Sequence, residues 1–103
     1  MKGMIYMTNT TQTLVIYGKL QNTKDGRTWT KYITKDINGK YYDVRFIAAC
    51  LTKPSKVANY KLTLAIGDYW AKPNVNPAFN DILYIKNVIS IEEIHYESQK
   101  IEF

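Results

Sequence analysis

Aromatic rings and cations recur close together in the first half of the chain. Tyr17 stands two residues before Lys19, and Tyr41 stands four residues before Arg45. Flat rings stack on unpaired bases while ammonium and guanidinium groups follow the phosphates, so the two residue types together favour binding of single-stranded nucleic acid. Spacings of two and four residues keep such side chains on one face of a β-strand, because side chains alternate between the faces of a sheet.

Groups suited to catalysis are sparse. His95 is the only histidine, so a Ser/His/Asp or Cys/His arrangement would depend on it alone. The single thiol, Cys50, forms neither an internal disulfide nor a cysteine-based zinc site, and the five glycines form no phosphate-binding loop. The nine carboxylates show no spacing typical of paired acid–base work. We therefore expect a non-catalytic protein with no cofactor and no bound metal, in which Cys50 is a small buried residue.

Length and charge indicate the class of protein. A chain of 103 residues makes one domain, and 46% hydrophobic with 22% charged residues is typical of a globular fold. Fourteen Lys and Arg against nine Asp and Glu give a net charge of +5, and the excess is larger before residue 92 because all four glutamates lie within residues 92–103. A basic domain favours a polyanionic partner, nucleic acid before membrane.

The expected location follows from three features of the sequence. We find no signal-peptide core near the start and no apolar run approaching the ~18 residues of a membrane span. A single cysteine suits a reducing compartment. These features predict a cytoplasmic protein.

Two dipeptides, Asp25-Gly26 and Asn38-Gly39, predict two consecutive β-hairpins over residues 12–49. If each dipeptide is a two-residue turn, the cross-strand pairs follow by counting outward, and this register decides which residues share a face. Counting gives one mainly apolar face, which we expect to be the core face, made of Leu14, Ile16, Gly18, Leu20, Trp29, Ile33, Ile37, Tyr42, Val44, Phe46 and Ala48.

The opposite face carries the expected binding groups. In the counted register Tyr32 lies between Lys19 on the first strand and Arg45 on the third, so that a ring separates two cations. Tyr17 and Tyr41 are further stacking platforms on this face.

Four charged residues fit these faces poorly. Lys31 and Lys35 interrupt the core face, and we expect the strand to coil or bulge outward there, so that both can contact phosphates. Asp36 and Asp43 share the binding face, although a phosphate track favours cations.

The rest of the chain predicts two more strands. Pro54 interrupts the link over residues 50–59, in which one short helical turn can start. Strands follow over 60–69 and 82–91, and the loop over 70–81 between them holds the site candidates Trp70, Lys72 and Phe79. We divide the chain into a lead-in over 1–11, a barrel over 12–91 and an acidic end over 92–103.

Five strands that begin with a three-strand meander predict an all-β fold, a five-stranded Greek-key OB-fold-like barrel with at most one short helix between strands 3 and 4. The same strand count suits an SH3-like barrel or a small sandwich. The chain resembles the small OB-fold single-stranded DNA-binding proteins of bacteriophages and bacterial mobile genetic elements. The resemblance covers residues 12–91 and rests on Leu14–Leu20, Thr28–Ile33, Tyr41–Ile47, Gly67–Trp70 and Ile82–Ile91. The cellular members carry a long tail with an acidic, Phe-terminated tip, where this chain has only Glu92–Phe103.

The resemblance implies a protein that binds single-stranded DNA, or RNA, with little sequence preference during replication or recombination of a phage or mobile element. A replication or recombination protein is a further expected partner, and Ile82–Ile91 is apolar enough to support a homodimer through a sheet edge. The expected nucleic-acid-binding residues are Tyr17, Lys19, Lys31, Tyr32, Tyr41, Arg45, Trp70, Lys72 and Phe79.

Other readings fit the same residues. In a protein-interaction module, such as an accessory subunit of a mobile-element polymerase or helicase or a phage inhibitor of a host protein, the tyrosines would be interface anchors. A structural virion component is a third reading. Each tyrosine can also serve the sheet alone through cross-strand pairing, and Trp70 and Phe79 can pack over the open end of the barrel.

Overall fold

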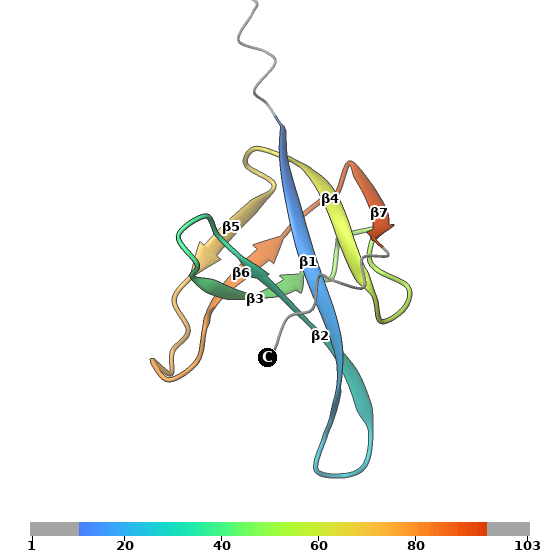
Figure 1. The fold of residues 1–103 in the computed structure, drawn as a ribbon, viewed down its shortest axis with the longest axis vertical. Coiled ribbons are helices and arrows are strands. Elements are labelled where there is room, and N and C mark those ends of the chain that lie inside the picture. Colours follow the sequence, from blue (N-terminus) through green and yellow to red (C-terminus); the bar gives the residue numbers. More distant parts are fainter. Residues whose placement is uncertain (1–10, 95–103) are drawn as a thin grey trace, which may run out of the picture.

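Seven β-strands and no helix make up the part of the chain that the computed structural model describes, residues 11–94. The strands are β1 (Thr11–Asn22), β2 (Thr28–Lys35), β3 (Tyr41–Phe46), β4 (Asn59–Ala65), β5 (Tyr69–Lys72), β6 (Asp81–Ile85) and β7 (Ser90–Ile94) (Figure 1). The all-β class is confirmed. The helical turn expected after Pro54 is wrong, because residues 47–58 form an irregular segment.

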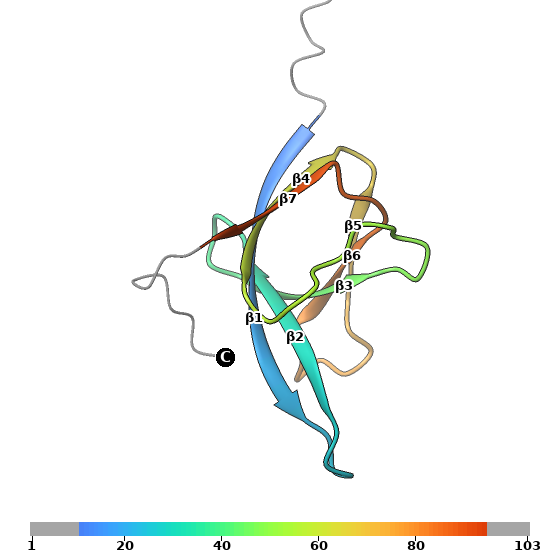
Figure 2. The same cartoon turned by 90° about the vertical axis from the view of Figure 1, so that its right-hand side faces the viewer.

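The strands form one mixed sheet in the order β5-β6-β3-β2-β1-β4-β7, with β5 and β7 at its edges, and the sheet is not closed. β3 and β6 are parallel, and every other neighbouring pair is antiparallel. Figures 1 and 2 show that the sheet curls, so that β4 and β7 lie across from β3 and β6. One face of the sheet therefore lines an interior, and the other faces outward.

The two strands expected over 60–69 and 82–91 are each divided in two. Between β4 and β5 the Asp68 amide donates to the Ala65 carbonyl at 3.0 Å, and Gly67 has a φ of 101°. This tight turn needs glycine and breaks the strand. Residues 86–89, which contain no glycine, separate β6 from β7. Trp70 and Lys72 lie in β5, where a loop was expected.

Both hairpin loops have three residues where two were expected. The Thr23 amide donates to the Arg27 carbonyl at 2.7 Å, and the Asp36 amide donates to the Lys40 carbonyl at 2.9 Å. Gly26 and Gly39 have φ values of 89° and 86°, whereas no other residue type among those described has positive φ. A two-residue type I′ turn needs positive φ at both central positions, but a three-residue loop needs it only at the last.

The extra loop residue turns β2 over, because a slip of one residue exchanges the faces of a strand. Gly18 lies opposite Tyr32, and Tyr32 lies opposite Val44. The expected pairing of Tyr32 with Lys19 and Arg45 is therefore wrong. The second loop adds another slip of one residue, which restores β3 to the expected face.

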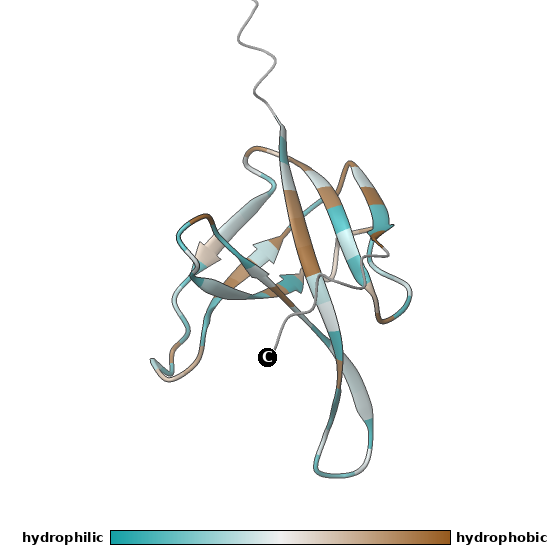
Figure 3. Ribbon diagram, in the orientation of Figure 1, coloured by the Kyte–Doolittle hydropathy of each residue, from teal (hydrophilic) through white to brown (hydrophobic). Residues whose placement is uncertain are grey.

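The core consists of the inward residues of this curled sheet. Its buried members are Ile16, Val44, Cys50, Tyr60, Leu62, Leu64, Ile85 and Val88, so the expectation of a buried Cys50 is confirmed. Hydrophobic and hydrophilic residues alternate along β4, as a strand with one buried face requires (Figure 3). The buried Thr34 on β2 donates its hydroxyl to the Val15 carbonyl at 2.7 Å, which explains how a polar residue is accommodated inside.

The ring of Tyr32 packs inside, 6.2 Å from Phe46 and 6.3 Å from Tyr60 between ring centroids. Its hydroxyl donates to the Lys56 carbonyl at 3.1 Å and so fixes the irregular segment 47–58. Burial, with a smaller effect from Tyr60, raises the pKa of Tyr32 to about 12. Gly18 makes room for this ring, because a Cβ there would lie 2.7 Å from Tyr32 Cε1 and 2.6 Å from the Ala58 carbonyl oxygen.

Most of the lead-in over 1–11 and of the acidic end over 92–103, including His95, lies outside the described residues. Within them, Thr11 begins β1 and Glu92 belongs to β7. No helix of the described part of the chain has the length and apolar character needed to cross a membrane.

Candidate nucleic-acid interface

One row of outward residues crosses five strands of the sheet. Lys19 on β1 lies opposite Lys31 on β2. The β2–β3 ladder ends at Tyr32 and Val44, and the next outward residues, Lys31 on β2 and Arg45 on β3, line the opening that follows. Arg45 lies opposite Tyr84 on β6, which in turn lies opposite Trp70 on β5. We call these five residues the outer row: three cations followed by two rings.

The neighbouring row on the same face is less charged. It consists of Tyr17, Ile33, Asp43, Ile82 and Lys72, each opposite the next on the adjacent strand. Ile33 and Ile82 are buried although they belong to the outward face, and they lie on either side of Asp43 in this row. Lys35 and Tyr41 pair in the row beyond, with the Lys35 ammonium 5.7 Å from the centre of the Tyr41 ring.

Both tryptophans of the chain expose their rings on this face. Trp70 is 40% exposed and stacks on Tyr84, with ring centroids 5.8 Å apart and planes inclined by 23°. Trp29, on β2 two residues before Lys31, is 49% exposed, so its expected place in the core is wrong. An aromatic side chain with half its surface in water has a face available for stacking on a base.

A hollow of about 370 Å³ opens where β2 and β3 part. The two strands pair only from Tyr32 opposite Val44 to Lys35 opposite Tyr41; before Tyr32, β2 pairs with β1 alone, and after Val44, β3 pairs with β6. Residues from both faces therefore line the hollow, namely Trp29, Thr30, Lys31, Tyr32, Asp43, Val44, Arg45 and Phe46.

The charges around the hollow are only partly compensated. The Lys31 ammonium lies 3.8 Å from Asp43 Oδ1, and Asn80 Nδ2 donates to the same oxygen at 3.2 Å. Within residues 11–94 the Arg45 guanidinium has no ion pair. Two cations and one carboxylate thus border the hollow, and its mouth has a net positive charge.

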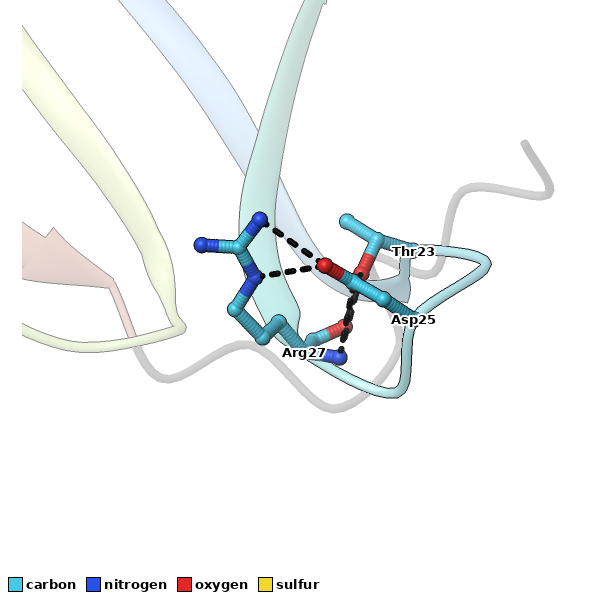
Figure 4. A network of polar contacts seen from close by, with 3 residues as sticks. All are labelled: Thr23, Asp25 and Arg27. Atoms are coloured by element: carbon cyan, nitrogen blue, oxygen red, sulfur yellow. Dashed lines mark hydrogen bonds and ion pairs between the residues drawn. The ribbon is translucent and has the colours of Figure 1, made fainter.

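The loop between β1 and β2 is held by its own polar groups (Figure 4). The Thr23 hydroxyl donates to Asp25, and the Arg27 guanidinium contacts Asp25 Oδ2 at 2.9 Å through Nη2 and at 3.0 Å through Nε. These bonds, the one from Thr23 first, lower the pKa of Asp25. The loop therefore keeps a defined shape beside the outer row.

Three asparagines shape the loop between β5 and β6. Asn74 Oδ1 accepts from the Asn76 amide at 3.1 Å, Asn76 Oδ1 accepts from the Ala78 amide at 2.9 Å, and Asn74 Nδ2 donates to the Asn80 carbonyl at 3.2 Å. Phe79 in this loop is 62% exposed. In Figure 1 this loop and the β1–β2 loop both lie in the lower part of the view, at the ends of β5 and β6 and of β1 and β2.

Most of the expected binding residues share the outward face. Seven of the nine do so: Tyr17, Lys19, Lys31, Tyr41, Arg45, Trp70 and Lys72. Tyr32 lies inside, and Phe79 lies in the β5–β6 loop. Sequence reasoning missed Trp29 and Tyr84 as members of this face. The sequence did contain a signal for Trp29. Trp29 shares one face of its strand with Lys31 and Lys35, and two lysines on an expected core face indicate that this face points outward.

Residues 11–94 contain no group of three or more His, Cys, Asp or Glu side chains that could hold a metal ion. No protein-family model, no curated protein and no solved structure matches the chain.

Proposed function

We propose that this chain is a non-catalytic single-stranded DNA-binding protein that binds the strand across its outward face. The observation that carries the proposal is the outer row, in which Lys19, Lys31 and Arg45 are followed by Tyr84 and Trp70. Cations at the spacing of neighbouring strands can follow a phosphate backbone, and exposed rings beside them can stack on its bases.

The strand pairing supports an OB-type barrel. If β4 and β5 are counted as one bent strand, and β6 and β7 as another, five strands remain. In this count, strand 1 pairs with strands 2 and 4, and strand 2 pairs with strand 3. Strand 5 pairs with strand 3 in parallel and with strand 4 antiparallel. This is the pairing of the five-stranded, partly open Greek-key barrel that we propose as the fold.

The position of the outer row agrees with such a barrel. OB folds bind oligonucleotides on the face of strands 2 and 3, between the loop after strand 1 and the loop between strands 4 and 5. Here the corresponding parts are β2 and β3, the loop over residues 23–27 and the loop over 73–80. The exposed Trp29, Trp70 and Phe79 lie on or beside these parts.

Binding of this kind depends mainly on charge and stacking, so we expect a steep dependence on salt and little overall sequence preference. The resemblance to phage and mobile-element proteins suggests a use in replication or recombination.

A titration of the intrinsic tryptophan fluorescence with oligo-dT tests the proposal, because both tryptophans of the chain lie on the proposed face. Quenching at low salt supports it, whereas the absence of binding at low salt would overturn it.

A protein-interaction module is the second candidate, and the exposed aromatic side chains favour it. Trp29, Trp70 and Phe79 leave 40 to 62% of their surface in water, and aromatic residues are enriched at protein interfaces. The partner would be a polymerase, a helicase or a host protein. Co-purification of one stoichiometric partner, together with indifference to oligo-dT, would favour this function over the first.

A further inference from the structure

We infer that the hollow between β2 and β3 takes one base of the bound strand and that Asp43 reads it, with a preference for guanine over thymine. The inference rests on the proposed function and adds to it the kind of base that one position selects. It starts from an acid, Asp43, placed within a cationic face.

The divergence of β2 and β3 makes a site for a flat ring. The hollow measures about 370 Å³, which lies within the range of small-molecule sites. Trp29 lines it and is 49% exposed, so its indole can stack against a ring that enters. Lys31 and Arg45 border the same opening and can hold the phosphates on either side of the inserted base.

Asp43 supplies the base-reading group. Among the residues that line the hollow it is the one carboxylate, and the contacts from Lys31 at 3.8 Å and Asn80 at 3.2 Å both reach its Oδ1. These contacts hold the group in place. An ionised carboxylate has two oxygens with about four acceptor sites, so Oδ2 can accept further hydrogen bonds.

The chemistry of a carboxylate selects among bases. It only accepts hydrogen bonds, and the free Watson–Crick edge of an unpaired guanine presents two adjacent donors, N1–H and the N2 amino group. Cytosine and adenine each present one amino group. Thymine presents one N–H between two carbonyl oxygens, which the carboxylate repels. The order expected at this position is guanine first, then cytosine and adenine, and thymine last.

The same contact explains why the acid is compatible with a phosphate-binding face. Lys31 and Arg45 flank Asp43 at the opening, and they can neutralise both the carboxylate and the neighbouring phosphates. The Asp43 carboxylate then contacts the hydrogen-bond donors of a base and not the phosphate backbone of the bound strand.

The experiment compares oligo-dT of about twelve nucleotides, within the site size of such domains, with the same oligonucleotide carrying one central dG, dC, dA or deoxyinosine. Affinities are measured at one fixed salt concentration. We expect the dG oligonucleotide to bind at least about five-fold more tightly than all-dT, the lower limit for a bidentate base contact. Deoxyinosine keeps the N1–H donor but lacks the amino group, so its affinity should fall between them.

Two variants test the role of Asp43. Asp43→Asn should reduce the dG-to-dT ratio to near one, because the affinity for all-dT rises with the loss of a negative charge while the dG oligonucleotide loses its contact with the carboxylate. Asp68→Asn removes the same charge from the bend between β4 and β5, away from the hollow, and should keep the wild-type ratio. A purely structural role of Asp43 would change both affinities together and leave the ratio unchanged.

The outcomes separate this inference from the proposed function. Equal binding of all five oligonucleotides by the wild-type protein, or a wild-type ratio in a folded Asp43→Asn variant, overturns the inference and leaves single-strand binding intact. The comparison of oligonucleotides needs no variant, so it stands even if Asp43→Asn fails to fold. The absence of binding to every oligonucleotide at low salt overturns both.

Discussion

Lys19 and Lys31 lie directly opposite each other across the β1–β2 ladder. Like charges in this arrangement destabilise a sheet, by an amount comparable to the roughly 0.2–1 kcal/mol of a favourable cross-strand pair. The contact between Lys31 and Asp43 spans 3.8 Å between partly exposed groups, and such pairs contribute little. The two ammonium groups repel each other across the ladder, and under the proposed function both would contact the phosphates of the bound strand.

Replacing Lys31 should therefore separate stability from binding. In Lys31→Gln we expect the free energy of unfolding to stay within about 0.5 kcal/mol of wild type, because a weak ion pair and a repulsion are lost together. The affinity for oligo-dT should fall, and the slope of log affinity against log salt should become shallower by about 0.7. Chemical denaturation and salt-dependent titrations measure the two effects.

Lys86→Gln is the matched control, since Lys86 is an exposed lysine in the link between β6 and β7. It removes the same charge away from the outer row. An equal loss of affinity in both variants would mean that overall charge, and not the outer row, controls binding.

Trp29→Leu tests stacking beside the hollow. Loss of one stacked base is worth about 1–3 kcal/mol, so the affinity should fall by about five-fold or more. Stability should change little because the side chain is half exposed. Anisotropy of a labelled oligonucleotide is the suitable measurement, since the substitution removes a fluorophore. Trp29→Phe keeps a ring and should retain most of the affinity; an equal loss in the two variants would contradict stacking.

Gly18→Ala should destabilise the fold by about 1–3 kcal/mol, the range for overpacking. The new methyl group would lie 2.6 Å from the Ala58 carbonyl oxygen, a backbone atom that cannot rotate away, and 2.7 Å from the Tyr32 ring. Denaturant unfolding measures the change. An unaltered midpoint would show that the segment 47–58 does not pack against β1 as described.

The raised pKa of Tyr32 predicts a loss of stability in alkali. The ordinary value is 10.0, and the value in the fold is about 12 because burial disfavours the phenolate. Below pH 10 the stabilisation is fully present; between pH 10 and 12 the unfolded chain releases this proton first, so stability falls. Tyr32→Phe should lose less stability than wild type over this window, with Tyr41→Phe as the control on the outer face. Identical pH profiles for wild type and Tyr32→Phe would contradict the burial of this hydroxyl.

The position of the hairpins was predictable, but their register was not read correctly. Asp25-Gly26 and Asn38-Gly39 do mark the turns, yet only the glycines take positive φ. The residues that select the longer loop precede each dipeptide: Thr23 contacts Asp25, and Asp36 Oδ1 accepts from the Asn38 and Lys40 amides at 2.9 Å. The extra residue in the first loop turns Lys31 outward and Tyr32 inward, and the extra residue in the second loop returns β3 to its expected face.

The later strands show what local patterns leave undetermined. The alternation of Leu62 and Leu64 predicted a strand correctly, but nothing in that pattern indicated that Gly67 would end it. The pairing of Tyr84 with Arg45 brings together residues 39 positions apart through a parallel ladder. Such a contact depends on the path of the whole chain, so Tyr84 could not be assigned to the binding face from its neighbours in sequence.

Titration of the wild-type protein with oligo-dT at several salt concentrations tests the central claim most directly. We predict quenching of tryptophan fluorescence at low salt, and a log–log slope of about −2 or steeper if the three cations of the outer row each neutralise one phosphate, at about 0.7 per phosphate. Failure to bind at low salt, or an affinity that does not change with salt, would contradict the account.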